Sequence, residues 1–275
     1  MIELPEAAVI AAQINQCLTG KRIQSVIAAH SPHKFAWYHG DPQAYPKILI
    51  GRTIDQAAGR GGFIEIKLQQ IRLLFSDGVI LRFHESKDKR PSKHQLLIEF
   101  ADATGLSASV QMYGGIMCFA EGDVDNRYYQ MAIEKPSPLS EGFDWSYFHD
   151  MIADPSVQKL SAKAFLATEQ RIPGLGNGTL QDILYNAKLH PKRKIAGLTE
   201  DERGNLFWSV KGTLADMTAQ GGRDTEKDLL GHPGGYRTKL SKNTAGKTCP
   251  VCNGNIIKES YMGGSIYYCD GCQQI

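Results

Sequence analysis

A chain of 275 residues with 42% apolar and 22% charged residues has an ordinary globular composition and is long enough for one large domain or two. No stretch approaches the roughly 20 apolar residues of a membrane-spanning helix, and acids stand where a signal peptide carries lysines, so a cytosolic protein is expected. The net charge of +2 is too small to indicate nucleic-acid binding by itself, but it divides unequally, with −3 over residues 1–155 and +5 over residues 156–275.

The N-terminal half is expected to form a helix followed by a largely antiparallel β-structure. Apolar residues recur at helical spacing over residues 3–18 and stop at Thr19-Gly20, a pair typical of a helix C-terminus. Residues 22–119 alternate between short apolar segments and turn signals, with a period of two over Phe63–Leu68. Asp77-Gly78 between two apolar runs predicts a hairpin turn. Together these patterns predict an antiparallel sheet or sandwich.

The C-terminal half is expected to be helical. Residues 122–156 are polar and contain three prolines, which is typical of an irregular linker. Helical patterns follow over residues 156–170, 177–189 and 198–220. Thr199 and Glu202 have the spacing of a capping box at the start of the third helix. Residues 224–248 are polar and glycine-rich and predict a loop.

Four of the six cysteines form two Cys-x2-Cys pairs separated by 16 residues: Cys249, Cys252, Cys269 and Cys272. This spacing is typical of a tetrahedral zinc site with four thiolate ligands, because turn-forming residues let both thiolates of a pair face one ion. Two disulfides are the alternative, which a cytosolic chain disfavours. Four protein ligands close the coordination sphere, so a structural zinc is expected, in a β-hairpin that turns at Gly263-Gly264. Cys17 and Cys118 lie in apolar contexts and are expected in the core.

A glycine-rich segment, PGLGNG at residues 173–178, lies between the first two C-terminal helices. Glycines let backbone N–H groups approach an anion closely, and Asn177 at the helix entrance is suited either to cap the helix or to contact a phosphate oxygen. Lys163 on the preceding helix adds a cation. Further basic residues follow the second helix: His190, Lys192, Arg193 and Lys194. The segment therefore predicts either a phosphate contact or an ordinary break between two helices.

The order of these motifs resembles that of one protein family. The sequence resembles the Fpg/Nei family, formamidopyrimidine-DNA glycosylase and endonuclease VIII. The shared features are MIELPE at the start, a β-rich half, PGLGNG between two helices, His-Pro after the second helix and the C-terminal cysteine hairpin. The resemblance implies an α+β multidomain fold with a leading helix. The implied divisions are an N-terminal β-sandwich at residues 1–122, a linker at 123–155, a helix-two-turns-helix domain at 156–222, a loop at 223–247 and a four-cysteine zinc finger at 248–275.

The resemblance also implies a ligand and a setting. Members of the family bind damaged double-stranded DNA in the cleft between the two halves and flip a base into a pocket, because chemistry on a stacked base is sterically blocked. The positive C-terminal half agrees with phosphate contacts from that side. By this resemblance the protein is expected to be a monomer with a structural Zn²⁺ and no membrane contact, in the bacterial cytosol or nucleoid.

At the N-terminus the sequence matches the family pattern at two acidic residues but not at the nucleophile. The family attacks the sugar with a proline that directly follows the initiator methionine, and this sequence has Ile2 there. A bulky second residue is expected to prevent methionine removal, so the free amine belongs to Met1. Glu3 matches the family's general acid/base glutamate, and Glu6 matches its second acid, which is assigned to positioning and water contacts.

The positions that contact DNA phosphates match in part. Asn177 matches the family's phosphate-binding asparagine, and Lys163 matches a basic residue on the preceding helix. The family's β-turn lysine falls on Gly62, with Arg60 nearby and out of register. The arginine at the tip of the family's zinc hairpin falls on Gly264. Loss of two cations is expected to weaken DNA binding without abolishing it.

The residues that fill the gap left by a flipped base also differ from the family pattern. Phe83 lies near the position of the family's methionine, and Met112 and Tyr113 lie in a shorter loop where formamidopyrimidine glycosylase has an Arg-Phe pair. Tyr113 is either an aromatic wedge in DNA or a turn residue packed on its own sheet. Tyr236 and Arg237 either contact the flipped base or belong to a solvated loop.

Three functions remain open at this point. The first is a base-excision-repair DNA glycosylase with altered chemistry, in which Glu3 activates a water or the Met1 amine replaces the proline nitrogen and adds lyase activity. The second is a catalytically inactive relative that binds damaged or abasic DNA. The third is a zinc-stabilised protein whose partner is not DNA. The retained acids and the enzymatic character of the family favour the first.

Overall fold

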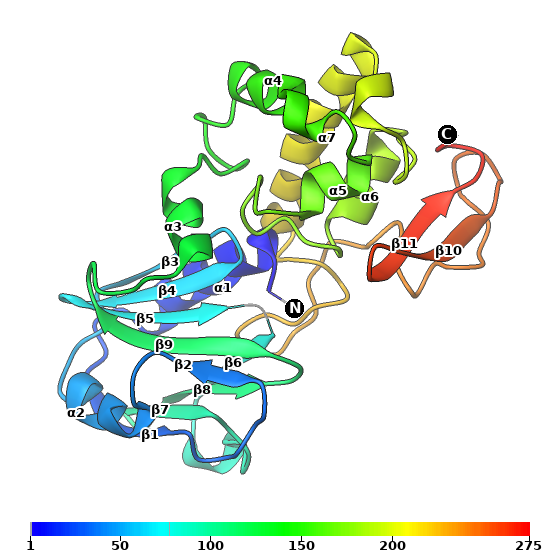
Figure 1. Ribbon diagram of the computed structural model, residues 1–275. Helices are drawn as coiled ribbons and strands as arrows, with labels where there is room; N and C mark the ends of the chain where they lie inside the picture. Colours follow the sequence, from blue (N-terminus) through cyan, green and yellow to red (C-terminus); the bar gives the residue numbers. More distant parts are fainter. Residues whose placement is uncertain (1, 77) are drawn as a thin grey trace.

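Helix α1, Leu4–Cys17, is the first element of the protein, for which the computed structural model describes residues 2–76 and 78–275. Its buried apolar residues recur at helical spacing: Leu4, Ala7, Ile10, Ala11 and Ile14. The helix ends at its C-cap Leu18, ahead of Gly20 with φ of +82°. The predicted helix is therefore confirmed, and it packs against strands β3 (Gln56–Arg60) and β4 (Phe63–Leu68) inside the N-terminal half (Figure 1).

Among the described residues, the strands of the N-terminal half form two sheets (Figure 1). One sheet is antiparallel, in the order β1-β7-β8-β6, and comprises β1 (Ile23–Ala28), β6 (Val79–His84), β7 (Leu96–Phe100) and β8 (Gly105–Val110). The other has the order β2-β9-β5-β4-β3 and comprises β2 (Ala36–Tyr38), β3 (Gln56–Arg60), β4 (Phe63–Leu68), β5 (Ile71–Ser76) and β9 (Gly114–Ala120). In this second sheet β2 runs parallel to β9, and the other neighbours are antiparallel.

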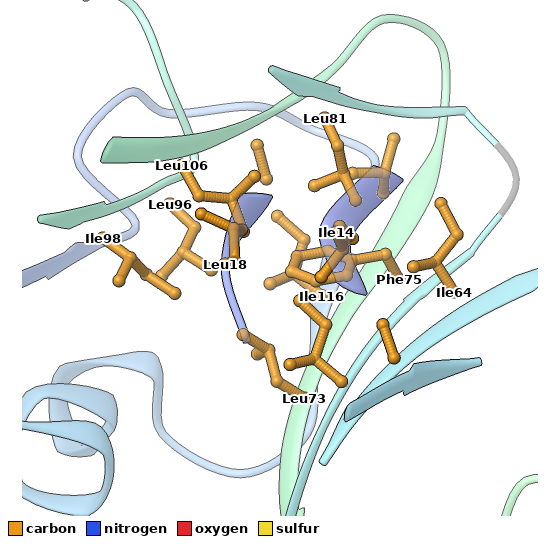
Figure 2. Packing of buried hydrophobic residues seen from close by; sticks show 14 of the residues in the cluster. Ile14, Leu18, Ile64, Leu73, Phe75, Leu81, Leu96, Ile98, Leu106 and Ile116 are labelled. Atoms are coloured by element: carbon orange, nitrogen blue, oxygen red, sulfur yellow. The ribbon is translucent and has the colours of Figure 1, made fainter. Parts of the chain in front are cut away.

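The two sheets and α1 share one apolar core, which Figure 2 shows from close by. Side chains from all three layers meet there: Ile14, Leu18, Ile64, Leu73, Phe75, Leu81, Leu96, Ile98, Leu106 and Ile116. The core face predicted for β4 is confirmed, because Ile64, Ile66 and Leu68 are fully buried. On its other face Lys67 is exposed but Glu65 is buried. The α+β class with an N-terminal sandwich and a leading helix is also confirmed.

The predicted hairpin turn at Asp77-Gly78 falls in part on Asp77, which lies outside the described residues. The strands on either side are β5 and β6, and over their described lengths they do not pair with each other. β5 pairs with β4 and β9, whereas β6 pairs with β8 in the other sheet. The hairpin prediction is wrong for these strands, because a turn signal specifies a local reversal and not which strand lies alongside.

Residues 123–155, which the sequence presented as an irregular linker, contain two helices. These are α3 (Arg127–Glu134) and α4 (Trp145–Ala153). Each starts at a polar N-cap: the side chain of Asn126 accepts a hydrogen bond from the Tyr129 N–H at 3.0 Å, and that of Asp144 accepts one from Tyr147 at 2.8 Å. The expectation of irregular structure is therefore wrong over these two segments.

The C-terminal half is built on α5 (Ala162–Ala167), α6 (Leu180–Asn186) and α7 (Glu200–Ala219). The capping box at the start of α7 is confirmed, with Thr199 and Glu202 exchanging hydrogen bonds at 2.8 and 3.2 Å. These helices and α4 enclose a second apolar cluster, which includes Phe143, Phe148, Phe165, Leu184 and Phe207. The remaining short helices are η1 (Pro42–Ala44), α2 (Tyr45–Leu49), η2 (Lys87–Lys89), η3 (Pro155–Val157) and η4 (Ile195–Gly197).

The chain ends in an antiparallel hairpin of β10 (Ile256–Tyr261) and β11 (Gly264–Cys269), which lies beside α6 (Figure 1). Met262 and Gly263 form its turn with φ of 51° and 71°, so the predicted hairpin is confirmed with its turn one residue earlier. None of the helices formed by residues 2–76 and 78–275 combines the length and the apolar character needed to cross a membrane.

Candidate functional site

The four cysteines of the two Cys-x2-Cys pairs converge at the base of the hairpin, with their sulfur atoms within 4.8 Å of one another. Gly271 makes room for them, because a Cβ there would lie 2.7 Å from the Cys252 sulfur. The backbone N–H of Cys272 donates to the Cys269 sulfur at 3.4 Å. Four thiolates that gather this closely and accept hydrogen bonds fit a structural zinc ion, which would hold the two ends of the hairpin together.

Polar contacts fix this metal cluster and its hairpin to α6. The hydroxyl of Tyr185 lies 3.1 Å from the Cys249 sulfur, where an O–H donates to a thiolate. One turn earlier on α6, the Gln181 side-chain oxygen accepts a hydrogen bond from the Tyr267 N–H at 2.9 Å. The hairpin is therefore held in a fixed position against the helical half.

Glu3 lies directly before α1 and reaches across to the PGLGNG segment of the other half. Its Oε1 accepts a hydrogen bond from the Gly178 N–H at 2.8 Å, and its Oε2 accepts one from the Thr179 N–H at 2.8 Å. These N–H groups lie at the start of α6, where backbone donors have no partner inside the helix. The anion that the glycine-rich segment holds in this structure is therefore the carboxylate of Glu3.

Two glycines of this segment are needed for the close approach. A Cβ on Gly176 would lie 2.5 Å from the carboxyl carbon of Glu3, and a Cβ on Gly178 would lie 1.6 Å from a guanidinium nitrogen of Arg223. Neither distance leaves room for a side chain. Both glycines have φ outside the left-handed region, so contact with the N-terminus, and not turn geometry, explains them.

Arg223 links both N-terminal acids. Its Nε and Nη2 donate to the two carboxylate oxygens of Glu6 at 2.9 and 2.7 Å, and its Nη1 lies 3.5 Å from Glu3 Oε2. All three side chains are at most 6% exposed. Burial acts to lower the pKa of Arg223, but the two carboxylates outweigh it and the pKa is raised. The guanidinium thus stays charged, and we call these three residues the junction cluster.

Arg223 was not among the residues predicted from the sequence. It is 217 residues from Glu6, and no local pattern connects the two. The available signal was the Gly221-Gly222 pair, whose φ values of 79° and 94° turn the chain back from the end of α7 toward α1. A basic residue directly after a helix-ending glycine pair does not by itself identify its partner.

Ile2 and Gly62 lie together beside the junction cluster. The Ile2 side chain is 6% exposed and belongs to the sandwich core. The turn after β3 packs against Gly174 so tightly that a Cβ on Gly174 would lie 2.2 Å from the carbonyl carbon of Gly61. Gly62 is less crowded: a Cβ there would lie 3.4 Å from the Gly174 Cα and 3.5 Å from the Ile2 carbonyl oxygen, which is ordinary contact.

A cleft of about 400 Å³ opens between α1, β6, the turn at residues 111–113 and the loop at residues 225–227. Both apolar and charged side chains line it, among them Ile2, Glu6, Ile10, Arg82, Met112, Tyr113, Glu226 and Lys227. The loop is anchored to the sandwich, because the Leu229 N–H donates to the Gln13 side chain and the Phe83 N–H donates to the Leu229 carbonyl, both at 2.9 Å. The cleft therefore has walls from both halves of the chain.

The tip of the zinc hairpin brings together three of the positions singled out in the sequence. Lys163 Nζ donates to the Tyr261 carbonyl at 2.5 Å, and Asn177 Nδ2 donates to the Ser265 carbonyl at 3.0 Å. A Cβ on Gly264 would lie 3.6 Å from Lys163 Nζ and 3.7 Å from the Asn177 amide. Burial lowers the pKa of Lys163. We call these three residues, Lys163, Asn177 and Gly264, the tip site.

The remaining predicted residues are dispersed. Met1 lies outside the described residues. Arg60 is on the surface, with its Nε 3.8 Å from Glu65 Oε1. Met112 and Tyr113 line the cleft. Of the two loop candidates for contact with a base, Tyr236 is buried and Arg237 is exposed.

The other two cysteines and Phe83 lie in the sandwich. Cys118 is buried in its core, as predicted, and Cys17 and Phe83 are partly buried against that core. Burial raises the pKa of the Cys118 thiol to about 12. Neither cysteine lies among the four sulfur atoms of the metal cluster.

Comparison with known proteins gives a consistent result along the chain. Residues 1–118 match the family described as Formamidopyrimidine-DNA glycosylase N-terminal domain. The chain is 26% identical over 281 residues to the formamidopyrimidine-DNA glycosylase of Bacillus anthracis, covering 99% of both, and 25% identical over 285 residues to that of Listeria innocua serovar 6a, covering 100% of both. The fold is similar to that of Lactococcus lactis Fpg in complex with DNA containing an abasic site, with a TM-score of 0.85 at 24% identity over 99% of this chain and 100% of that one.

Proposed function

The chain belongs to the formamidopyrimidine-DNA glycosylase family, and from that premise we propose that it binds damaged duplex DNA in the cleft between its two halves and does not excise a base. The observation that carries the proposal is the junction cluster. A general base directs a carboxylate lone pair at the proton of the attacking group, and every donor that the carboxylate already holds occupies one of its lone pairs. Both oxygens of Glu3 already accept backbone hydrogen bonds, and Arg223 faces the same carboxylate.

The acids of this N-terminus therefore act as structural links. Glu3 ties the start of α1 to the start of α6, and Glu6 ties α1 to the loop that follows α7. A buried carboxylate that loses its partner is costly, so the cluster holds the two walls of the cleft at a fixed separation. Ile2 contributes an apolar surface, and its side chain has no nucleophile.

Phosphate binding is supported by the tip site. Asn177 is exposed just before α6, and the ammonium of Lys163, a residue that is 6% exposed, lies near the same glycine of the hairpin tip, Gly264. Amide and ammonium donors at a helix N-terminus are the groups that hold phosphate oxygens without reading sequence. Because Gly62 and Gly264 add no cations, we expect moderate affinity with a shallow dependence on salt.

Base excision is the second candidate, and one observation favours it. A separate cleft of about 270 Å³ lies beside Glu3 and is lined by Ile2, Gly62, Phe63 and the PGLGNG segment. It offers space in which a sugar or a water can approach the Glu3 carboxylate. In this candidate Glu3 activates the water, or the Met1 amine attacks the sugar and forms a Schiff base.

The test uses the full-length, zinc-loaded protein and labelled duplexes that are undamaged, contain a tetrahydrofuran abasic analogue, or carry one of a panel of oxidised and alkylated bases. Binding is measured by fluorescence anisotropy. Excision is measured under single-turnover conditions, and borohydride trapping on a natural abasic site detects a Schiff base. We expect damaged duplexes to bind more tightly than undamaged ones, with neither excised base nor trapped adduct.

Each alternative has its own signature. Glu85 is an exposed glutamate on the sandwich and serves as the control. Excision that is abolished by Glu3→Gln and kept by Glu85→Gln would refute binding without excision and support the second candidate, base excision by Glu3. A trapped adduct with unchanged excision in Glu3→Gln assigns the chemistry to the N-terminal amine. Equal and weak affinity for every duplex rejects DNA as the ligand and leaves a zinc-stabilised protein with another partner.

A further inference from the structure

A patch of large apolar side chains lies exposed at the edge of the sandwich. Trp37 is 59% exposed, Phe35 48% and Met112 66%. Large aromatic side chains are usually covered in a protein of this size, and neighbouring exposed ones mark interaction sites. The proposed phosphate contacts and the junction cluster use none of the three.

Strand pairing holds Trp37 in place without covering it. β2 runs parallel to β9, so that Trp37 lies opposite Gly115, and the Gly114 N–H donates to the Phe35 carbonyl at 3.0 Å. Gly115 has no side chain to pack over the indole. The indole instead lies beside the ring of Tyr113, with centroids 6.4 Å apart and the planes tilted by 33°.

The patch is continuous with the cleft. Tyr113 and Met112 line the cleft, and Trp37 extends the same apolar surface outward along β2. Two hydrogen bonds to Gly78 hold the turn that carries Met112 and Tyr113. The Gly78 N–H donates to the Tyr113 carbonyl at 3.1 Å, and the Gly78 carbonyl accepts from the Gln111 N–H at 3.2 Å. Lys34 Nζ lies 5.3 Å from the centre of the Phe35 ring and adds a cation at the border.

We propose that Trp37, together with Tyr113, forms a stacking platform for an unpaired base of the bound DNA and so gives the protein its preference for damaged duplexes. This inference rests on the proposed function. An abasic site leaves the opposite base without a pairing partner, and such a base presents an apolar face that an aromatic ring can cover. Stacking of one base on one aromatic side chain strengthens binding by about tenfold and tolerates any base.

The chemistry of the patch favours a nucleobase over other partners. A fixed, exposed indole beside a second ring and next to a lysine matches a flat base followed by a phosphate. A second copy of this chain is the competing occupant, because an exposed apolar edge also favours self-association. The same variants distinguish the two.

The experiment compares Trp37→Ala with Trp208→Ala, since Trp208 on α7 is 68% exposed and belongs to neither the cleft nor the patch. Affinity for abasic and undamaged duplexes is measured by anisotropy, and the oligomeric state by light scattering. Trp37→Ala is expected to bind the abasic duplex about tenfold more weakly and the undamaged duplex unchanged. Trp37→Phe is expected to keep most of the preference, and Trp208→Ala all of it.

A spectroscopic measurement checks the contact directly. Trp145→Phe with Trp208→Phe leaves Trp37 as the sole tryptophan of the sequence, and its fluorescence is expected to be quenched by the abasic duplex and not by the undamaged one. Equal affinities of Trp37→Ala and Trp208→Ala with no quenching overturn the inference while the proposed function stands. Conversion of a wild-type dimer to a monomer at unchanged DNA affinity assigns the patch to self-association and overturns it. If the wild type binds no duplex, the proposed function fails and this inference fails with it.

Discussion

The junction cluster and the tip site differ in how their polar side chains are paired inside the protein. In the junction cluster, Glu3 and Glu6 are sealed against Arg223, and each charge has its partner inside the protein. In the tip site, Asn177 is exposed, and the position opposite it is a glycine that contributes no side chain. In the junction cluster both acids are paired with a cation inside the protein, whereas the tip site exposes the Asn177 amide beside Lys163, which is 6% exposed and donates to a carbonyl oxygen.

This difference separates a structural role from a binding role on physical grounds. A buried ion pair contributes little net stability when intact, but it is costly to break because it leaves an unpaired charge. Exposed donors cost little to remove and gain energy only when a ligand arrives. The junction cluster should therefore affect the free energy of unfolding, and the tip site should affect affinity for DNA.

The largest expected effect follows from Arg223→Met, which leaves the two buried carboxylates with backbone hydrogen bonds but without their cation. The free energy of unfolding should fall by about 3–5 kcal/mol in urea titration. Arg60→Met is the matched control, since Arg60 is 44% exposed at 3.8 Å from Glu65, and it should cost less than about 1 kcal/mol. Adding Glu3→Gln and Glu6→Gln to Arg223→Met should restore part of the loss. Equal stability of the two arginine variants would show that the junction cluster does not hold the halves together.

A smaller effect is expected at the tip site. Lys163→Met removes one cation, so the slope of log affinity against log salt should become shallower by about 0.9. Lys47→Met, on α2 away from the hairpin (Figure 1), should leave the slope unchanged. Lys163 is 6% exposed and donates to the Tyr261 carbonyl, so Lys163→Met should lower the urea midpoint slightly, whereas Lys47→Met should leave it unchanged. A large loss of stability in Lys163→Met with an unchanged slope would place Lys163 with the structural charges instead.

A gain of affinity is expected from adding a cation at the tip site. Gly264→Arg adds a guanidinium where a Cβ has ordinary contacts at 3.6 Å or more, so affinity for duplex DNA should rise and the salt slope should steepen by about 0.9. Gly263→Arg is the control, because Gly263 has φ of +71° and an arginine there is strained by about 1–2 kcal/mol. Equal effects of the two variants would mean that added charge, and not its position at the tip site, governs binding.

Local features of the sequence were predictable because neighbouring residues decide them. The Cys-x2-Cys pairs, the capping box of Thr199 with Glu202 and the helix over residues 3–18 each depend on spacing within a few residues. The linker prediction was wrong over α3 and α4, since prolines mark breaks and do not exclude helices between them. The hairpin prediction was wrong at β5 and β6, since the pairing of strands is a long-range choice.

By itself the sequence determined the metal cluster, the helix over residues 3–18, and the presence of Glu3 and Glu6 without a nucleophilic side chain at Ile2. Only the tertiary structure decided what those acids contact. The charged partner of Glu6 is 217 residues away, and the aromatic partner of Trp37, Tyr113, lies in the turn before β9. Contacts of this kind depend on how two halves pack, because burial selects partners by shape and charge and not by distance along the chain.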